Sequence, residues 1–344
     1  MISFVTNPMG ALFALFLAAG APMSSGEAAV CLAQSASVDR LSAPEFEKKV
    51  ATDLAHVGSL SFGAPNRGSL MNGVRPPEGA LFELVTPEES WGTAETVAYL
   101  TRAVESVHRR HPGTPPVHLG HISAAHGGKL KPHLSHQSGR DVDLGFYYSD
   151  KRVWYRRGTP TNLDLPRTWA LIQALVTETD VEMILVDRSL HEAIRDEGRR
   201  QGASEKWLHS LFKGEGELPP LIRHARGHGT HLHVRFYSPL AERNAARAYP
   251  TLVASNLIAP VHSFTHYKAK KGDTLGRLAT RFGVSVQEIQ RANGLRGTFI
   301  QAKRVYLIPR AGGPVVSEPT LRPIPPRRLP ETVTSKSASA EKAG

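Results

Sequence analysis

The chain has 344 residues, enough for one full-size domain and a small second one, and 40% of them are hydrophobic, as in globular proteins. Its net charge of +11, from 42 Lys and Arg against 31 Asp and Glu, favours a polyanionic partner such as nucleic acid, an anionic membrane or an acidic cell-wall polymer. The single cysteine, Cys31, excludes an internal disulfide framework and a cysteine-rich zinc site.

The N-terminus predicts an export signal. Residues 11–20 form an apolar run that is too short to span a bilayer, and small residues follow it as far as Ala29. We therefore expect a signal peptide over residues 1–30, a periplasmic or secreted protein, and no transmembrane helix. Lipidation of Cys31 is the less favoured alternative, because Val30 stands where a lipoprotein signal prefers a small residue.

A folded domain is predicted over residues 45–250. The stretch 58–82 is rich in Gly, Pro and Asn, which indicates irregular chain. Beyond it, apolar residues recur at helical spacing in some segments and alternate in others. The expected helices are 93–111, one around 171–176, one from Ser189 to about Gly202, and 204–212; the expected strands are 117–122, 141–146, 181–186 and 230–236. This interleaving with long loops predicts an α+β fold.

A second, smaller unit is expected after a linker over residues 251–265. Residues 266–310 read as a short strand, a helix opened at Asp273-Thr274, a second helix and a closing strand at 305–308. The remaining residues, 311–344, are rich in Pro, Arg, Ser and Lys and poor in apolar side chains. We therefore expect a disordered basic tail.

Two segments carry the ligand types of a catalytic zinc ion: Ser-His-Gln-Ser-Gly-Arg-Asp-Val-Asp at 135–143 and His-Leu-His at 231–233. Residues two apart on a strand point to the same face, which holds for both histidines of the second segment and both aspartates of the first. A turn at 137–139 can fold the histidine of the first segment back beside its aspartates. The candidate ligands are His136, Asp141, Asp143, His231 and His233. Any one of these histidines alone would more often be structural, but their joint pattern favours a metal site.

Other hydrolytic sites find no support in the sequence. His191-Glu192 begins like a helical His-Glu-x-x-His motif, but Arg195 occupies the fifth place and cannot bind metal. A Gly-x-Ser-x-Gly elbow is absent, and Cys31 lies beside the expected leader, so a serine or cysteine nucleophile is not indicated.

Residues 135–144 and 228–235 resemble the penicillin-insensitive murein endopeptidases, which are zinc peptidases of the LAS group. Residues 66–70, 91–93 and 181–184 support the resemblance, which covers about 59–239. It implies an α+β metallopeptidase domain with a central antiparallel sheet. The chain departs from the family at Ser238, where well-known members carry a disulfide cysteine, so the fold must hold without that bridge.

The resemblance also assigns roles to individual residues. It makes His136, Asp143 and His233 the ligands of one zinc ion, and His231 and His228 the catalytic histidines that do not bind it. It leaves His133 and Asp141 in supporting places around the ligands or as additional metal ligands. Zinc in such a site lowers the pKa of a water molecule and polarises the scissile carbonyl.

Residues 267–275, 278–286, 292–295 and 305–309 resemble a LysM domain. Such domains have a βααβ fold and bind N-acetylglucosamine-containing glycans in a shallow groove. The expected glycan-binding residues are Gly272, Asp273, Thr274, Leu275, Asn293 and Ile300. Two departures reduce the expected affinity: Gly276 stands where a bulky residue is common, and a glycine usual near residues 301–303 is missing.

Together these expectations describe a secreted zinc endopeptidase that cleaves D-Ala–meso-diaminopimelate cross-links in peptidoglycan and is anchored to the glycan by LysM. One alternative is a D,D-carboxypeptidase acting on the same polymer. Another is a non-catalytic peptidoglycan-binding or regulatory protein. Nucleic-acid binding would explain the charge but neither the ligand set nor the LysM-like segment, so no nucleic-acid partner is expected.

Overall fold

The computed structural model describes residues 25–150, 153–258, 264–309 and 323–331. Its chain divides into two compact units, which are described separately here. The first unit comprises residues 1–41, 55–245 and 321–344, and the second comprises residues 42–54 and 246–320. The apolar run of the predicted signal peptide, residues 11–20, lies outside the described residues. None of the helices in the described ranges has both the length and the apolar content needed to cross a membrane.

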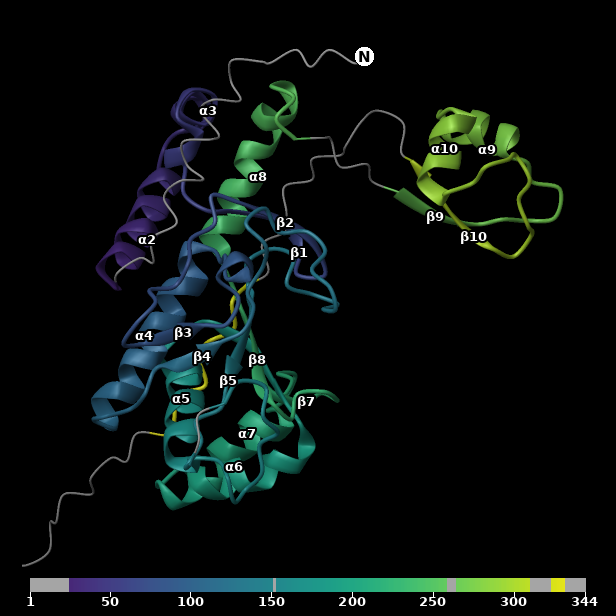
Figure 1. The fold of residues 1–344 in the computed structure, drawn as a ribbon. Coiled ribbons are helices and arrows are strands. Elements are labelled where there is room, and N and C mark those ends of the chain that lie inside the picture. The colour runs from purple at the N-terminus through teal and green to yellow at the C-terminus, as the bar shows by residue number, and fades with distance from the viewer. Residues whose placement is uncertain (1–24, 151–152, 259–263, 310–322, 332–344) are drawn as a thin grey trace, which may run out of the picture. The chain divides into compact units, whose positions relative to one another are not determined.

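A six-stranded sheet forms the centre of the first unit (Figure 1). Its strands are, in spatial order, β3 (Phe82–Leu84), β4 (Val117–Leu119), β5 (Asp141–Gly145), β8 (His231–Phe236), β6 (Val181–Val186) and β7 (Ile222–His224). The four central strands are antiparallel, as predicted, whereas β3–β4 and β6–β7 are parallel, so the whole sheet is mixed. In the central pair β5–β8, Asp143 lies opposite His233.

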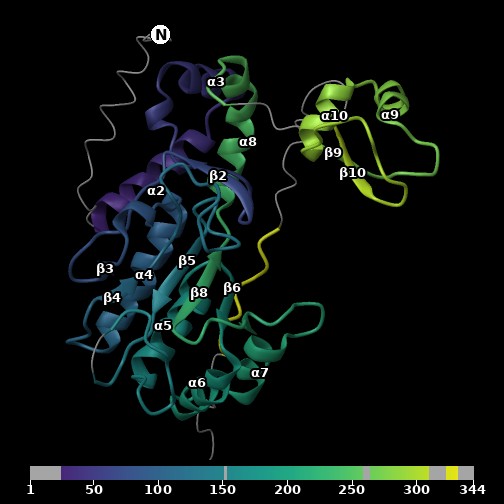
Figure 2. The ribbon, with the colours of Figure 1, turned by 45° about the vertical axis from the view of Figure 1, so that its right-hand side comes forward.

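Helices of the first unit pack their apolar stripes against this sheet. They are α4 (Ala94–Arg110), α5 (Leu165–Glu178), α6 (Arg188–Arg200) and α7 (Glu205–Lys213). In both views α4 and α5 lie side by side along the sheet (Figures 1 and 2). Thr93, the first residue of the helix expected over 93–111, caps α4 and accepts a hydrogen bond from the Thr96 N–H at 3.0 Å. The helix expected from Ser189 begins at Arg188, and Asp187 caps it.

Several elements had no clear periodic signal in the sequence. The Gly-rich stretch expected to be irregular contains the hairpin β1 (Leu60–Ala64) and β2 (Arg67–Met71), and short 3-10 turns occur at η1 (Leu54–His56) and η2 (Pro87–Glu89). Helix α2 (Ser25–Asp39) packs on α4 and runs through the end of the predicted signal peptide, including Cys31. Helix α8 (Pro239–Ala254) follows the last strand of the sheet.

Ser238 occupies the position at which the resemblance implies a disulfide cysteine. Its side chain is fully buried, and its hydroxyl lies 2.9 Å from Thr93 Oγ1 and 3.4 Å from Thr96 Oγ1. These hydrogen bonds join the chain after β8 to the start of α4. A buried hydroxyl network therefore stands at this position in place of a covalent bridge.

Gly127 joins the hairpin to the loop that carries His136. Its φ is +65°, and an added Cβ would lie 2.3 Å from Gln137 O and 2.5 Å from Leu70 N. We expect Gly127→Ala to lower the free energy of unfolding by roughly 2–4 kcal/mol, from left-handed strain plus the clash with backbone. Urea denaturation measures this change.

Gly128→Ala is the matched control. The φ of Gly128 is +77°, and a Cβ added there would have no atom within 4 Å, so only the backbone strain of about 1–2 kcal/mol remains. Equal losses in both variants would contradict the role given to the clash.

The second unit contains the predicted βααβ module. Its elements are β9 (Phe264–Lys268), α9 (Leu275–Phe282), α10 (Val286–Asn293) and β10 (Val305–Pro309), with the two strands antiparallel. Buried Leu278, Ile289, Tyr306 and Ile308 form most of its small core. The same unit also includes α3 (Ala43–Thr52) and the C-terminal part of α8, where the Arg247 guanidinium lies 4.0 Å from the Phe46 ring centre.

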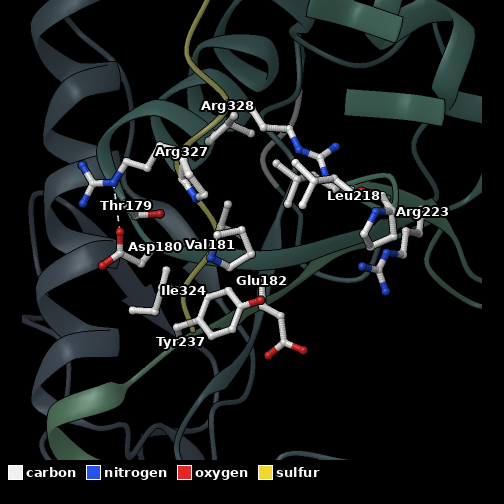
Figure 3. A pocket seen from close by; sticks show the side chains of 15 residues that line it. Thr179, Asp180, Val181, Glu182, Leu218, Arg223, Tyr237, Ile324, Arg327 and Arg328 are labelled. Carbon is white, nitrogen blue, oxygen red and sulfur yellow. Dashed lines mark hydrogen bonds and ion pairs between the residues drawn. The ribbon is translucent and has the colours of Figure 1, made fainter. Parts of the chain in front are cut away.

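Part of the predicted disordered tail is ordered on the first unit. Residues 323–331, here called the C-terminal strap, contact α7 and line a pocket together with Val181 and Glu182 at the start of β6 (Figure 3). Arg327 Nε is 2.9 Å from Asp180 Oδ1, and the Arg328 guanidinium donates to the carbonyls of Ser210 and Pro219. Trp207 Nε1 donates to the Arg328 carbonyl at 2.7 Å. Composition predicted disorder because the segment lacks a core of its own, and residues 323–331 are nevertheless ordered because they pack on the surface of the first unit.

Candidate active site

Three buried side chains from distant parts of the chain meet beside the β5–β8 pair. Asp143 Oδ1 lies 3.2 Å from His136 Nε2 and 3.0 Å from His233 Nδ1, and the two ring nitrogens are 3.1 Å apart. β5 and β8 supply the aspartate and one histidine, and the loop before β5 supplies the other. These are the three residues that the resemblance selected as ligands, and the structure brings them together.

Each of these two histidines has one ring nitrogen that faces Asp143 and one that faces away from it. The nitrogen that faces away has a partner of its own, so the nitrogen that faces Asp143 is available to a metal. His136 Nδ1 lies 3.0 Å from the Ile122 carbonyl, which can only accept, so Nδ1 carries the hydrogen and Nε2 the lone pair. His233 Nε2 lies 3.5 Å from Asp141 Oδ1, which leaves Nδ1 facing Asp143. Such outer-shell carboxylates and carbonyls are the usual partners of histidines that bind metal.

Asp141 contacts both histidines of the cluster. Its carboxylate receives Arg235 Nε at 2.5 Å and Nη2 at 3.0 Å, and it also accepts the backbone N–H of His136 at 3.2 Å. Both oxygens are therefore occupied by neighbours on β8 and on the loop before β5. These contacts fit a supporting place for Asp141, which holds His136 and His233 from outside the cluster.

Replacing Asp141 by Asn should weaken metal binding without removing a ligand. The amide keeps the shape but lowers the basicity of His233 and weakens the pairing with Arg235, so zinc affinity should fall about 10–100-fold. Competition with a chromophoric chelator measures the affinity. Thermal unfolding of the metal-free protein serves as a control for the loss of the buried ion pair. An unchanged affinity in a folded variant would show that Asp141 does not tune His233.

The electrostatics of the cluster favour a bound cation. Burial alone would raise the pKa of Asp143, but His136, His233 and His231 hold it well below the usual range of an aspartate. Burial alone would lower the pKa of His233, but Asp141 and Asp143 raise it to about 9. An ionised carboxylate therefore stands among imidazoles that compensate its charge. Zn²⁺ would displace the proton of His233, and two imidazoles and one carboxylate with fixed outer partners suit this ion, so the residues present fit it.

His231 and His228 lie beside this set but outside it. His231 Nε2 is 3.6 Å from Asp143 Oδ1, and its Nδ1 is 2.9 Å from Thr230 Oγ1. Burial lowers the pKa of His231 to about 4, so its ring is neutral at pH 7. The His228 ring centre lies 5.1 Å from that of His231 and 5.6 Å from that of His233. Burial, and then the nearby His233, lower the pKa of His228 as well.

A family model described as penicillin-insensitive murein endopeptidase matches residues 61–255, more than half of the chain. The chain belongs to this family. A LysM domain model matches residues 267–309, the βααβ module. No curated protein matches the chain. The two family matches identify a peptidoglycan hydrolase, and they indicate an extracellular or periplasmic location at the cell wall.

Within this murein endopeptidase, the structure places His133, to which the resemblance gave a supporting place, beside two residues that sequence reasoning did not select. His121 and His133 lie on the other side of Asp143, with Nδ1 atoms 4.0 Å and 3.6 Å from its Oδ2. His121 is the last residue but one of the predicted strand 117–122, and its place in a His-rich stretch was the available signal. Glu89 Oε2 lies 3.2 Å from His121 Nε2, and no motif pointed to it.

Two aromatic residues of the endopeptidase domain were also missed. The ring centres of Trp154 and Tyr155 lie 6.1 Å and 5.9 Å from that of His231, and the Tyr155 ring is stacked on it. Tyr155 is 62% exposed, so it forms an accessible wall beside the buried histidine. These residues lie in a polar loop between β5 and α5, where no periodic pattern marks a functional side chain.

The LysM candidates are distributed between structural and accessible positions. Leu275 is buried in the module core, and Asn293 ties α10 to β10 through hydrogen bonds with Leu307 N and O. Asp273 accepts from the Lys270 N–H, and Thr274 caps α9. Gly272 has a φ of +91°, and open space surrounds an added Cβ there. Ile300 is only partly buried against the core.

Proposed function

We propose that the protein is a zinc-dependent endopeptidase that hydrolyses D-Ala–meso-diaminopimelate cross-links in murein and is anchored to the glycan by its LysM domain. The observation that carries the proposal is the convergence of His136 Nε2, Asp143 Oδ1 and His233 Nδ1 within 3.2 Å of one another. Membership of the murein endopeptidase family supports the substrate, and the LysM match supports the anchor.

The three donors would hold the ion and leave coordination positions open for small molecules, as in catalytic zinc sites. When bound, zinc supplies Lewis acidity, which polarises a carbonyl and lowers the pKa of a water molecule. The outer partners Ile122 and Asp141 keep both rings in the ligating tautomer. This preorganisation means that little rearrangement is needed at the moment of reaction.

His231 is placed to move the proton of the hydrolytic step. In the tautomer whose Nδ1–H donates to Thr230, Nε2 carries the lone pair and lies 3.6 Å from the metal-side oxygen of Asp143. A neutral imidazole there can take a proton from the attacking water and return it to the leaving amine, which must depart as a neutral group. His228, next to His231, adds a second neutral imidazole to the same wall.

Digestion of purified sacculi tests the proposal. Muropeptides released by the full chain are separated and identified with and without a chelator, followed by readdition of zinc. Conversion of D-Ala–meso-diaminopimelate-linked dimers to monomers, lost with the chelator and restored by zinc, is the expected result. Release of free D-alanine without loss of dimers would favour a carboxypeptidase. Binding to sacculi with no released product would favour a non-catalytic wall-binding protein.

A further inference from the structure

An exposed aromatic ring covers the histidine that moves the proton in the proposed mechanism, and that mechanism gives it no role. The Tyr155 ring is stacked on the His231 ring, with the ring centres 5.9 Å apart and the ring planes inclined by 20°. His231 is buried, whereas Tyr155 is 62% exposed. One face of the tyrosine therefore covers the histidine, and the rest of the ring can contact a molecule that enters the site.

The backbone holds Tyr155 in an uncommon conformation. Its φ is +62°, in the left-handed region that bulky residues seldom adopt. The residues that follow are fastened to their surroundings. The Arg156 carbonyl accepts a hydrogen bond from the Tyr148 hydroxyl, and the Gly158 N–H donates to the Gly229 carbonyl at 2.7 Å, in the segment that leads into β8. Strain that is maintained by such contacts is typical of functional sites.

The neighbouring Trp154 seats this loop on the sheet. Its indole lies against Gly120, just after β4, and near Gly145, at the end of β5. A Cβ added at Gly120 would lie 2.3 Å from Trp154 Cζ2 and Cη2, and one added at Gly145 would lie 3.6 Å from Cε3. The indole centre is 6.0 Å from that of Tyr155 and 6.1 Å from that of His231. The two glycines thus leave room for a tryptophan that supports Tyr155 beside the catalytic cluster.

We propose that Tyr155 binds substrate, and that its exposed ring forms the wall of the subsite for the peptide stem on the leaving-amine side of the scissile bond. The inference rests on the proposed function, in which His231 returns a proton to the leaving amine. An amine that reaches His231 comes beside the ring stacked on it. A flat aromatic ring gives a large contact area at a low entropic cost. The wall therefore favours a cross-link, whose leaving amine carries a whole stem, over a single terminal D-alanine.

Steady-state cleavage of a defined peptide dimer by the zinc-loaded full chain tests this wall. The dimer carries no sugar and joins a tetrapeptide donor stem to a tripeptide acceptor stem, so that the two products differ. In Tyr155→Ala we expect KM to rise about 5–30-fold, as for an aromatic anchor at an interface, with kcat unchanged. Tyr155→Phe keeps the ring and should restore KM. Phe299→Ala removes an 80% exposed aromatic ring of the LysM domain and is the control with unchanged kinetics.

Product inhibition locates the contact on one side of the scissile bond. The inhibition constant of a product is an equilibrium constant, so it reports binding without the reaction step. The tripeptide, which carries the freed amine, should inhibit Tyr155→Ala about 5–30-fold more weakly than the wild type. The tetrapeptide, which carries the new D-Ala carboxylate, should inhibit both proteins equally.

The outcomes separate this inference from the proposed function. A lower kcat with unchanged KM and inhibition constants would mean that Tyr155 only orients His231, and would overturn the subsite. Unchanged kinetics, or weaker inhibition by the tetrapeptide alone, would overturn it too. Tyr155→Asn removes the ring in a residue that tolerates a positive φ, and it replaces Tyr155→Ala if that variant does not fold. A wild-type chain that leaves the dimer intact would instead overturn the proposed function.

Discussion

Asp143→Asn is expected to abolish murein hydrolysis and zinc binding together. The carboxylate is the one anionic donor of the proposed ligand set, and its Oδ1 contacts the metal-facing nitrogens of His136 and His233. An amide oxygen is neutral and a poor zinc ligand, so the ion and its Lewis acidity are lost. Because that stabilisation is worth several kcal/mol, kcat/KM should fall by about three orders of magnitude or more.

Metal analysis and dimer cleavage are measured on the same purified Asp143→Asn protein. Asp187→Asn is the matched control. Asp187 caps α6 by accepting a hydrogen bond from the Ser189 N–H, so this substitution removes a carboxylate that has no contact with the Asp143 cluster. The control should keep its zinc and its activity, and circular dichroism checks that both variants are folded. An Asp143→Asn protein that retains both zinc and activity would remove Asp143 from the ligand set.

His231→Ala is expected to separate chemistry from metal binding. The ring lies outside the proposed ligand set but faces it, and it is neutral at pH 7 because burial lowers its pKa to about 4. Loss of a positioned proton carrier typically costs about 10²–10⁴-fold, so kcat should fall by this factor while zinc content stays at the wild-type value. A fall in kcat without a matching rise in KM places the effect in the reaction step.

The measurement pairs steady-state cleavage of a purified cross-linked muropeptide with metal analysis. His209→Ala, which removes an exposed histidine of α7, serves as the control. Loss of zinc from His231→Ala would instead make His231 a ligand. Retention of wild-type kcat would remove it from the reaction. The two histidines of β8 thus receive separable roles, although they sit two residues apart on one strand.

Much of the fold follows from periodicity alone. The apolar stripe of α4, the alternation in β5 and β8 and the apolar run of β6 predicted those elements within a few residues, because their apolar side chains fill the same core. The hairpin β1–β2 escaped, since its strands are short and lie in a stretch rich in Gly, Pro and Asn. They are held by pairing with each other and by Gly127. The strap escaped because its packing partners lie on α7 and β6, far away in sequence.

The cluster of His136, Asp143 and His233 was predictable because each member sits in a short, specific motif. Residue spacing on β5 and β8 placed Asp143 and His233 on faces that can meet, and the register confirms that they lie opposite each other. The surrounding groups could not be ranked in this way. Asp141 differs from Asp143 only by its tertiary partner Arg235, and Glu89 lies in a 3-10 turn that reaches the site only through folding.

The strap has a consequence for how the glycan-binding module is retained. The module is joined to the first unit on one side through α8 and on the other through residues that lead to the strap, which is fastened by Arg327 and Arg328. It is therefore joined to the first unit at both of its ends. A cut in the chain between α8 and β9 leaves the module attached only through the noncovalent contacts of the strap, whereas a cut between β10 and the strap leaves it attached through the backbone.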